Sequence, residues 1–457
     1  MKRIQILPLI IALLWIYGCK KEQGFYVAKT SFTIVNTQAY VDSLVQFTNT
    51  SDIDRVAYSW DFGDGVTSDL KDPSHTYTNH GQYTITLKTF VNKTLSNSAS
   101  QNISVLIGEK YLSLKTITEG YNFAEGADSS IFVIGVTSGT DGAQVFLSKF
   151  DRNLRFSWVK YFNKNSYSVV GNIEKTADGN FLISGMFNDP ANSNHFALTK
   201  IDQQGGIIWD TKYEQTNGEC IFATEAKDGG IISIGSEETA YNSSVNVLKT
   251  DGNGNFEWQR NFATEGLMSA KNIIPLNDGY LFAASTNADN CVITKLNLNG
   301  EVVWKKSTGW QIYGATVYRV FSSTIAMNDK YLVVVNDGNY YVMVFDLEGN
   351  FIKRSYSEIE ENTLIASTKK NKFVIGGRDD QKETTIVNFF TDILDRYDTR
   401  LYGKRNLNCQ PTRGNGSALK SLSGGNLLFM GIRYKECMGT SVGSTLLVKI
   451  KENGDIQ

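Results

Sequence analysis

Short apolar runs separated by glycine-containing turns recur along most of the chain. Runs of four to eight residues that are rich in β-branched and aromatic side chains, bounded by Asp-Gly or Asn-Gly, predict β-strands. No long stretch has the apolar period of an α-helix. The pattern therefore predicts an all-β protein. Seven such runs lie at 132–136, 181–185, 231–235, 280–284, 332–336, 373–377 and 427–431.

Tryptophans mark the period of this pattern. Trp158, Trp209, Trp258 and Trp304 are 51, 49 and 46 residues apart. A period near 50 residues is typical of propellers and solenoids. Each unit has a turn, an apolar strand, a variable loop, a second apolar strand, a glycine turn and a strand that carries the tryptophan. Seven units predict a seven-bladed β-propeller over residues 107–457, with four strands in each blade.

The two ends of this region complement each other. The last unit stops at 451–457, in the turn before its outermost strand, and Lys110 to Lys115 form a surplus strand-like segment before the first unit. We expect this N-terminal strand to complete the last blade and close the ring, because an open blade edge invites aggregation.

The turn and the tryptophan form a recurring motif, Asp-x-x-Gly-x-x-x-Trp, as in Asp202, Gly205 and Trp209. It resembles the blade repeat of quinoprotein-like propellers and, less closely, the Asp-box of sialidases. In both families the glycine and the tryptophan serve the turn and the packing. The resemblance thus implies a blade and no particular reaction.

Residues 28–106 carry a different set of motifs. Trp60-Asp61-Phe62-Gly63-Asp64-Gly65, Asp72-Pro73-Ser74-His75-Thr76-Tyr77 and Gly81-Gln82-Tyr83-Thr84-Ile85-Thr86-Leu87 follow in that order. Together they resemble the PKD domain family. The resemblance implies an immunoglobulin-like β-sandwich of an extracellular protein that acts as a spacer or interaction module. We expect Asp61 and Asp64 to cap the turn, with calcium ligation as the alternative.

The N-terminus reads as an export signal. Lys2 and Arg3 precede the run from Ile4 to Tyr17, which is apolar apart from Gln5 and too short to span a bilayer comfortably. Residues 1–18 therefore predict a signal peptide. Ile16-Tyr17-Gly18-Cys19 resembles the lipobox of bacterial lipoproteins, including the surface lipoproteins of the Bacteroidetes type. The resemblance implies lipid attachment at Cys19, a tether over 19–27, and an outer-membrane lipoprotein that is periplasmic or surface-exposed. An uncleaved anchor helix is the alternative.

Charge and composition narrow the function. The formal net charge is −2, and no basic cluster is long enough to follow a phosphate backbone, so no nucleic-acid partner is expected. His75, His80 and His195 are the only histidines, which disfavours a histidine-rich metal site. No nucleophile elbow, zinc signature or phosphate loop is present. We expect no cofactor, no metal, no catalytic residue and a monomer, although enzymatic activity stays an open alternative.

Ligand contacts are expected on the propeller face that carries the longer, more variable loops. Gly309-Trp310-Gln311-Ile312-Tyr313 places two aromatic rings in one such loop, and aromatic rings suit sugars and peptides. Packing of that loop onto the blade edge is the alternative. The candidates are Trp310, Tyr313, Tyr241, Tyr340, His195, Arg378, Asp379 and Arg413. We therefore expect a binding module for an extracellular glycan or protein, with a structural or adhesion spacer and a carbohydrate lyase or hydrolase as alternatives.

The cysteines fit an oxidising compartment. Cys409 precedes the last blade and Cys437 lies between its second and third strands, so a disulfide between them is expected. Cys220 and Cys291 fall in different blades, where they either pair or remain buried thiols.

Overall fold

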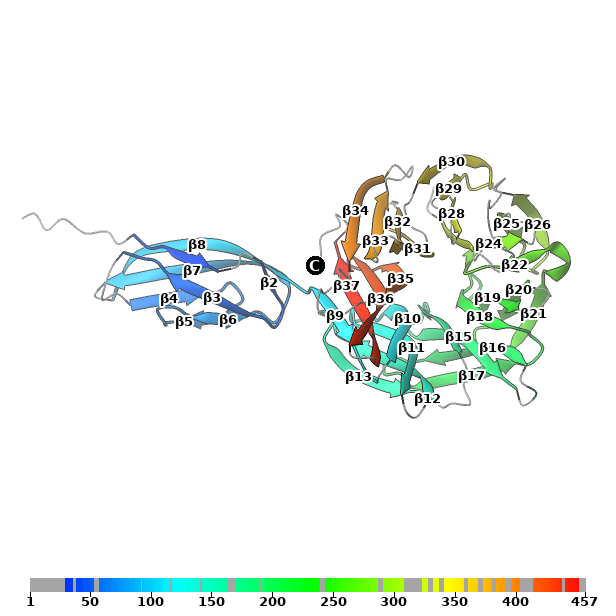
Figure 1. The fold of residues 1–457 in the computed structure, drawn as a ribbon, viewed down its shortest axis with the longest axis horizontal. Helices are drawn as coiled ribbons and strands as arrows, with labels where there is room; N and C mark the ends of the chain where they lie inside the picture. The colour runs from blue at the N-terminus through cyan, green and yellow to red at the C-terminus, as the bar shows by residue number, and fades with distance from the viewer. Residues whose placement is uncertain are drawn as a thin grey trace, which may run out of the picture. The chain divides into compact units, whose positions relative to one another are not determined.

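The structure is a computed structural model of the 457-residue chain. It divides into two compact units, residues 1–106 and 107–457, which are treated separately below (Figure 1). The structure describes residues 29–35, 38–52, 57–91, 93–115, 117–139, 142–162, 169–189, 191, 193–238, 243–286, 291–307, 323–327, 332–336, 341–356, 361–368, 373–379, 384–390, 396–402, 414–437 and 440–451. Within these ranges the regular elements are strands, apart from one 3-10 turn, η1 (Ala263–Glu265). The expected all-β class is confirmed.

The first unit contains two β-sheets. One has the order β1 (Phe32–Ile34), β3 (Leu44–Asn49) and β6 (Ser74–Thr76); the other has the order β2 (Gln38–Tyr40), β8 (Thr94–Leu106), β7 (Gly81–Val91), β4 (Ala57–Asp61) and β5 (Thr67–Ser68). Phe32 and Phe47 from the first sheet contact Trp60 from the second, with ring centroids 5.1 and 5.8 Å apart. The sheets therefore pack face to face over a shared aromatic core.

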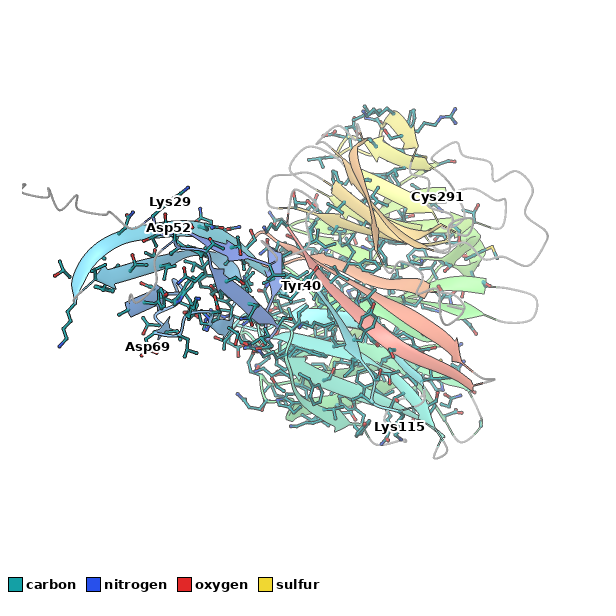
Figure 2. The ribbon with its side chains drawn as sticks, turned by 60° about the vertical axis from the view of Figure 1, so that its left-hand side comes forward. Lys29, Tyr40, Asp52, Asp69, Lys115 and Cys291 are labelled. Atoms are coloured by element: carbon teal, nitrogen blue, oxygen red, sulfur yellow. The ribbon has the colours of Figure 1, made fainter. Side chains whose placement is uncertain are left out.

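Polar contacts hold the edges of this sandwich. The buried Trp60 ring donates its Nε1 hydrogen to the carbonyl of Leu70 at 2.9 Å, which satisfies its polar atom. At one end, the backbone N–H of Lys29 donates to the Asp52 carboxylate at 3.0 Å (Figure 2). The first described residues are thereby fixed to the loop that follows β3.

In the second unit, neighbouring strands are antiparallel and mostly follow one another in chain order, but the first and the last group of strands join in one eight-stranded sheet through a parallel pair, with Ile117 opposite Gly443. Figure 1 shows the sheets arranged around a common centre, as in a β-propeller. The strands of the first three sheets are β10 (Ile117–Glu125), β11 (Ile131–Gly139), β12 (Gly142–Phe150), β13 (Phe156–Tyr161); β14 (Val169–Lys175), β15 (Phe181–Asn188), β16 (Asn194–Ile201), β17 (Ile207–Tyr213); and β18 (Glu219–Glu225), β19 (Ile231–Glu238), β20 (Ser243–Thr250), β21 (Phe256–Asn261).

The remaining groups of strands repeat the arrangement, and the last three strands belong to the same eight-stranded sheet as the first four given above. Their strands are β22 (Leu267–Ser269), β23 (Ile273–Leu276), β24 (Gly279–Thr286), β25 (Cys291–Leu296), β26 (Val302–Ser307); β27 (Ser323–Met327), β28 (Leu332–Asn336), β29 (Tyr341–Phe345), β30 (Phe351–Tyr356); β31 (Glu361–Ser367), β32 (Phe373–Asp379), β33 (Thr384–Phe390), β34 (Arg396–Tyr402); and β35 (Gly414–Ser421), β36 (Leu427–Cys437), β37 (Thr440–Ile450). The second strand of each sheet is an almost continuous buried run, because both of its faces pack against neighbouring sheets.

Strand β9 (Glu109–Leu112) lies beside the last strand, β37, although the two are far apart in the sequence. They pair antiparallel, with Leu112 opposite Thr445 and Glu109 opposite Val448. The hydroxyls of Ser113 and Ser444 lie 2.6 Å apart. The strand is shorter than the segment from Lys110 to Lys115 that the sequence indicated.

Successive sheets are joined by tryptophan-to-glycine contacts. Gly300 has a left-handed φ of +78° because it turns the chain between the third and fourth strands, and a Cβ there would lie 2.7 Å from the Trp258 ring of the preceding sheet. The carboxylate of Asp251 caps the equivalent turn by accepting N–H groups from Asn253 and Asn255, each at 2.8 Å. The same contact joins Trp158 to Gly205, Trp209 to Gly254, Trp258 to Gly300 and Trp304 to Gly349.

A basic residue two positions after the tryptophan strengthens three of these contacts. Lys306, for example, lies 5.3 Å from the Trp304 ring centroid and donates to the carbonyl of Glu348 at 2.6 Å. Trp209 has no such basic residue, and there Tyr213 donates to the carbonyl of Gly254 at 2.7 Å. The other two basic residues are Lys160, which donates to Gln204, and Arg260, which donates to Asn299.

An ion pair also recurs within the sheets. An aspartate in the turn between the first and second strands pairs with a lysine on the third strand. The pairs are Asp128–Lys149 at 3.3 Å, Asp178–Lys200 at 2.7 Å, Asp228–Lys249 at 3.1 Å and Asp278–Lys295 at 2.7 Å. The lysine on the third strand, like the tryptophan on the fourth, is thus part of the repeat.

The cysteines lie on strands where they are described. Cys220 on β18 and Cys291 on β25 are buried and form no disulfide. Figure 2 labels Cys291. Burial raises the pKa of the Cys220 thiol to about 12, which makes it unreactive near neutral pH. Cys437 is the last residue of β36, so it ends a strand instead of lying in a loop as expected. Cys409 lies outside the described residues, and the expected disulfide stays a prediction.

Candidate functional site

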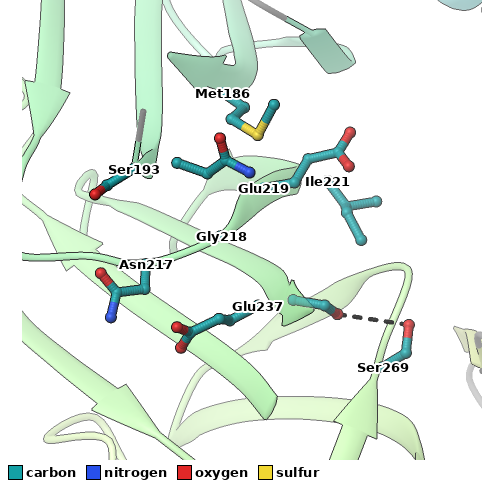
Figure 3. Close-up of a pocket in the computed structure, with 10 residues that line it drawn as sticks. Met186, Ser193, Asn217, Gly218, Glu219, Ile221, Glu237 and Ser269 are labelled. Carbon is teal, nitrogen blue, oxygen red and sulfur yellow. Dashed lines mark hydrogen bonds between the residues drawn. The ribbon is translucent and has the colours of Figure 1, made fainter. Parts of the chain in front are cut away.

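A cleft of about 630 Å³ opens in the second unit where strands of three successive sheets end (Figure 3). Its walls come from the connection that leads into β16, from the crossover between β17 and β18, from the end of β19 and from β22. The lining residues are Met186, Ser193, Asn194, Asn217, Gly218, Glu219, Ile221, Ser236, Glu237 and Ser269. These connections belong to the face on which the variable loops were expected.

The crossover from Glu214 to Gly218 is anchored on the preceding sheet. The Thr216 hydroxyl accepts the N–H of Phe196 at 2.8 Å and donates to the carbonyl of Tyr213 at 2.6 Å. The N–H of Gly218 donates to the carbonyl of Asn194 at 2.9 Å. These bonds hold one wall of the cleft in place, because the crossover has no ladder partner of its own.

Gly218 brings this wall close to β19. Its φ is +93°, and a Cβ at this position would lie 2.3 Å from the carbonyl oxygen of Ser236. Only glycine fits such an approach without moving the backbone. The glycine therefore sets the distance between the crossover and the strand that carries Ser236 and Glu237.

His195 supports the wall from behind and does not line the cleft. The residue is buried, its Nδ1 lies 2.6 Å from the carbonyl of Thr216, and its Nε2 lies 3.3 Å from the Asp189 carboxylate. The N–H of Ser193 and this imidazole hold the pKa of Asp189 below its usual range. In the structure His195 hydrogen-bonds the crossover, and its expected contact with a ligand stays a prediction.

The lining is mostly polar. It offers two carboxylates, two amides and three hydroxyls, while Met186 and Ile221 add an apolar strip beside Glu219 (Figure 3). The buried hydroxyls of Ser236 and Ser269 lie 3.5 Å apart across two sheets. Such a surface suits a ligand with many hydroxyl or amide groups, since each can exchange its water for a protein partner.

Glu219 also acts on Tyr121, a residue of the first sheet of the second unit. Burial, followed by the charge of Glu119 and its hydrogen bond at 3.3 Å, and then the charge of Glu219, raises the pKa of Tyr121 to about 12. Glu119 lies on β10 and Glu219 on β18, which belong to different sheets, yet both raise the pKa of the Tyr121 phenol. Glu219 therefore acts on Tyr121 as well as lining the cleft.

Most of the other expected ligand residues fall outside the described structure. Arg378 and Asp379 end strand β32, and their side chains are not described. Trp310, Tyr313, Tyr241, Tyr340, Arg413 and the lipid-attachment residue Cys19 lie outside the described residues. Sequence reasoning missed Asn217, Glu219 and Glu237, because it searched the loops for aromatic rings. The signal was the Asn-Gly-Glu sequence at the crossover.

No group of three or more potential metal ligands occurs in the described part of the chain. In the first unit, Asp61 and Asp64 accept backbone N–H groups from Gly63 and Val66 at 2.9 and 3.1 Å, as turn caps do. Asp64 also lies 2.7 Å from the His75 imidazole, whose ring stacks on Phe62. Among the described residues, no helix has the length and apolar content needed to cross a membrane.

The first unit has the size, the face-to-face sheets and the buried Trp60 that its motifs implied. Residues 27–106 match the PKD domain family. The PKD1 domain of Vibrio anguillarum Epp is 28% identical and covers 17% of this chain and 93% of its own, with a TM-score of 0.15. Collagenase ColA of Bacillus cereus is 26% identical over 161 residues, which are 33% of this chain. The chain spans only 16% of the length of that collagenase.

Other solved structures resemble a larger part of the chain. A quinonprotein alcohol dehydrogenase-like protein from Bacteroides thetaiotaomicron is 10% identical, covers 81% of this chain and 96% of its own, and has a TM-score of 0.43. A protein of unknown function from Bacteroides caccae is 11% identical and covers 60% and 93%, with a TM-score of 0.40. At these identities the likeness concerns the fold.

Proposed function

We propose that the chain is an envelope-anchored lipoprotein whose propeller-like unit binds an extracellular glycan in the cleft around Gly218, while the PKD domain acts as a spacer or interaction module. The observation that carries the proposal is the cleft itself. Its lining is rich in hydroxyls, amides and carboxylates, and a glycine crossover anchored by Thr216 shapes it. Polar groups held in place in this way lose little freedom when they bind a hydroxyl-rich ligand.

Two further parts of the proposal rest on sequence and topology. The signal-like residues 1–18 and Cys19 support a lipid-anchored outer-membrane protein, periplasmic or surface-exposed and monomeric. The pairing of β9 with β37 and the seven apolar runs support a seven-bladed ring closed by an N-terminal strand. A closed ring would present the cleft on a rigid frame.

Binding is tested with the chain lacking residues 1–19 on a glycan array, followed by titration of each hit. Asn217→Ala removes an amide from the cleft and should weaken binding about five-fold or more, as loss of one hydrogen bond predicts. Asn253→Ala removes an exposed amide from a glycine turn and is the matched control. If both variants bind as the wild type does, the ligand does not occupy this cleft.

Membrane attachment has its own test. Cys19→Ala should move the protein from the membrane fraction to the soluble envelope fraction and abolish labelling with a fatty-acid analogue, because the acyl chains supply the anchoring energy. Cys220→Ala removes a buried thiol instead and should leave both unchanged. Membrane attachment of the Cys19→Ala variant, without labelling of the wild type, would contradict the lipoprotein assignment.

The PKD match favours one other function, a spacer without a small ligand. On that account the array gives no hit, and deletion of residues 29–106 changes what the cell attaches to.

A further inference from the structure

The imidazole of His195 faces a hydrogen-bond acceptor at each of its nitrogens. Nδ1 lies 2.6 Å from the carbonyl oxygen of Thr216, and Nε2 lies 3.3 Å from the Asp189 carboxylate. A carbonyl oxygen and an ionised carboxylate can only accept. The N–H of Ser193 and this imidazole hold the pKa of Asp189 below its usual range, so its carboxyl is ionised near neutral pH. Both bonds therefore form only when the imidazole carries two protons.

The segments around this imidazole carry ionisable side chains of both signs. Asp189, on the connection from β15 to β16, contacts the ring directly. Lys212 of β17 reaches it only across the Phe187 ring: the Nζ lies 4.9 Å from the Phe187 centroid, which lies 5.2 Å from that of the imidazole. Glu214 begins the crossover and Glu219 follows it. The direct contact with Asp189 favours the second proton, whereas Lys212 and burial oppose it, so Asp189 is the residue to change in a test.

Loss of the second proton would break one of the two bonds. With a single proton the ring can donate either to Thr216 or to Asp189, and its other nitrogen then turns a lone pair toward an oxygen. Thr216 anchors the crossover, because its hydroxyl forms two hydrogen bonds with the preceding sheet. Two residues further on, Gly218 lines the cleft. The charge of His195 is thus coupled to the wall of the cleft.

We propose that His195 is a pH-sensitive positioning residue, which fixes the crossover when it carries two protons and holds it less firmly when it carries one. Imidazole side chains change charge between about pH 5 and 8. The wall of the cleft should therefore be more rigid in mildly acidic than in mildly alkaline solution. This change needs no ligand, whereas a matching fall in glycan affinity as the pH rises rests on the proposed function.

Hydrogen–deuterium exchange of residues 214–218 in the full chain tests the proposal, with each rate divided by that of an unstructured peptide at the same pH. The corrected rate should be about five-fold higher at pH 8 than at pH 5.5, as loss of one hydrogen bond predicts. Asp189→Asn should bring the two rates within about two-fold, because the amide accepts from Ser193 through its oxygen and donates through its nitrogen to a singly protonated ring. Asp64→Asn makes the same change at the His75 pair of the first unit and should leave the ratio at about five-fold.

Equal corrected rates at the two pH values in the wild type would overturn the proposal, as would a ratio that stays near five-fold in Asp189→Asn. If Asp189→Asn fails to fold, His195→Gln decides instead. An amide does not titrate, so its ratio should be near one, and a ratio that stays near five-fold would overturn the proposal. Absence of any bound glycan would overturn the proposed function and leave the exchange result intact.

Discussion

Two glycines with the same backbone conformation have different surroundings. Gly229 and Gly300 have φ values of +82° and +78°, respectively. A Cβ at Gly229 would meet nothing within 4 Å, whereas one at Gly300 would press into the Trp258 ring. Replacing Gly229 thus tests the cost of backbone strain alone, whereas replacing Gly300 tests that strain together with the contact to Trp258.

Gly229→Ala should lower the free energy of unfolding by about 1 to 2 kcal/mol, the cost of a left-handed alanine. Gly300→Ala introduces the same strain and also displaces Trp258, so we expect its free energy of unfolding to fall by about 1 to 3 kcal/mol more. Urea unfolding of the second unit measures the free energy for both variants. An equal decrease in the two variants would show that the Trp258 contact contributes little to stability.

Lys249 is the most buried lysine of the recurring ion pairs. Its side chain is 1% exposed and its Nζ lies 3.1 Å from Asp228 and 2.9 Å from Glu257, both of which are about half exposed. Lys249→Ala should cost about 2 kcal/mol of stability, because it leaves two partly buried carboxylates without their cation. Lys295→Ala, with a more exposed pair, should cost under about 1 kcal/mol. If the two variants lose similar stability in thermal unfolding, the expected difference between Lys249 and Lys295 is wrong.

At the scale of the elements, the turn aspartates link stability to pH. Hydrogen bonds from Ser130 and Lys149 lower the pKa of Asp128, and the bond from Lys295 lowers that of Asp278. Burial alone would raise the pKa of Asp178, but the bonds from Lys200, Thr176 and Asn180 outweigh it and lower the pKa. Because these folded-state pKa values lie below the unfolded ones, the pairs stabilise the fold above about pH 4.

This stabilisation should disappear as the pH falls from about 5 through the lowered pKa values, so the melting temperature of the second unit should drop steeply between pH 4 and 2. Asp178→Asn should lower the melting temperature at pH 7 and make its acid dependence shallower. Glu348→Gln should change neither. A melting curve of the Asp178→Asn variant that keeps the full acid dependence would exclude this pair as a cause.

The strands could be predicted from the sequence where the residues that specify them lie close together in the chain. Apolar runs and turn glycines lie within a few residues of one another, so the strands around Phe132 or Ile231 follow from the sequence. The cleft does not, because it depends on Gly218 approaching Ser236 and on β22 lying beside β19. Trp258 shows an intermediate case: its spacing marks the repeat, while its partial burial depends on the next sheet.

At the scale of the whole molecule, the second unit uses both ends of its own sequence in one sheet. Deleting residues 107–113 removes β9 and exposes the edge of β37, so we expect the second unit to lose several degrees in melting temperature and to aggregate. Deleting residues 29–106 removes a unit with its own core and should leave the remaining melting transition unchanged. Calorimetry measures the melting temperature of the second unit in each deletion variant. The same melting temperature in both variants would contradict a role for β9.

The bond between Ser113 and Ser444 joins residues 331 positions apart. A contact that closes so long a loop is among the last to form, because the entropy lost in closure must be offset by structure already present. During synthesis, β9 emerges hundreds of residues before β37 and has no strand to pair with until β37 is made. A chaperone that binds exposed strand edges would therefore bind this segment, and it would stay bound to a chain that ends before residue 440.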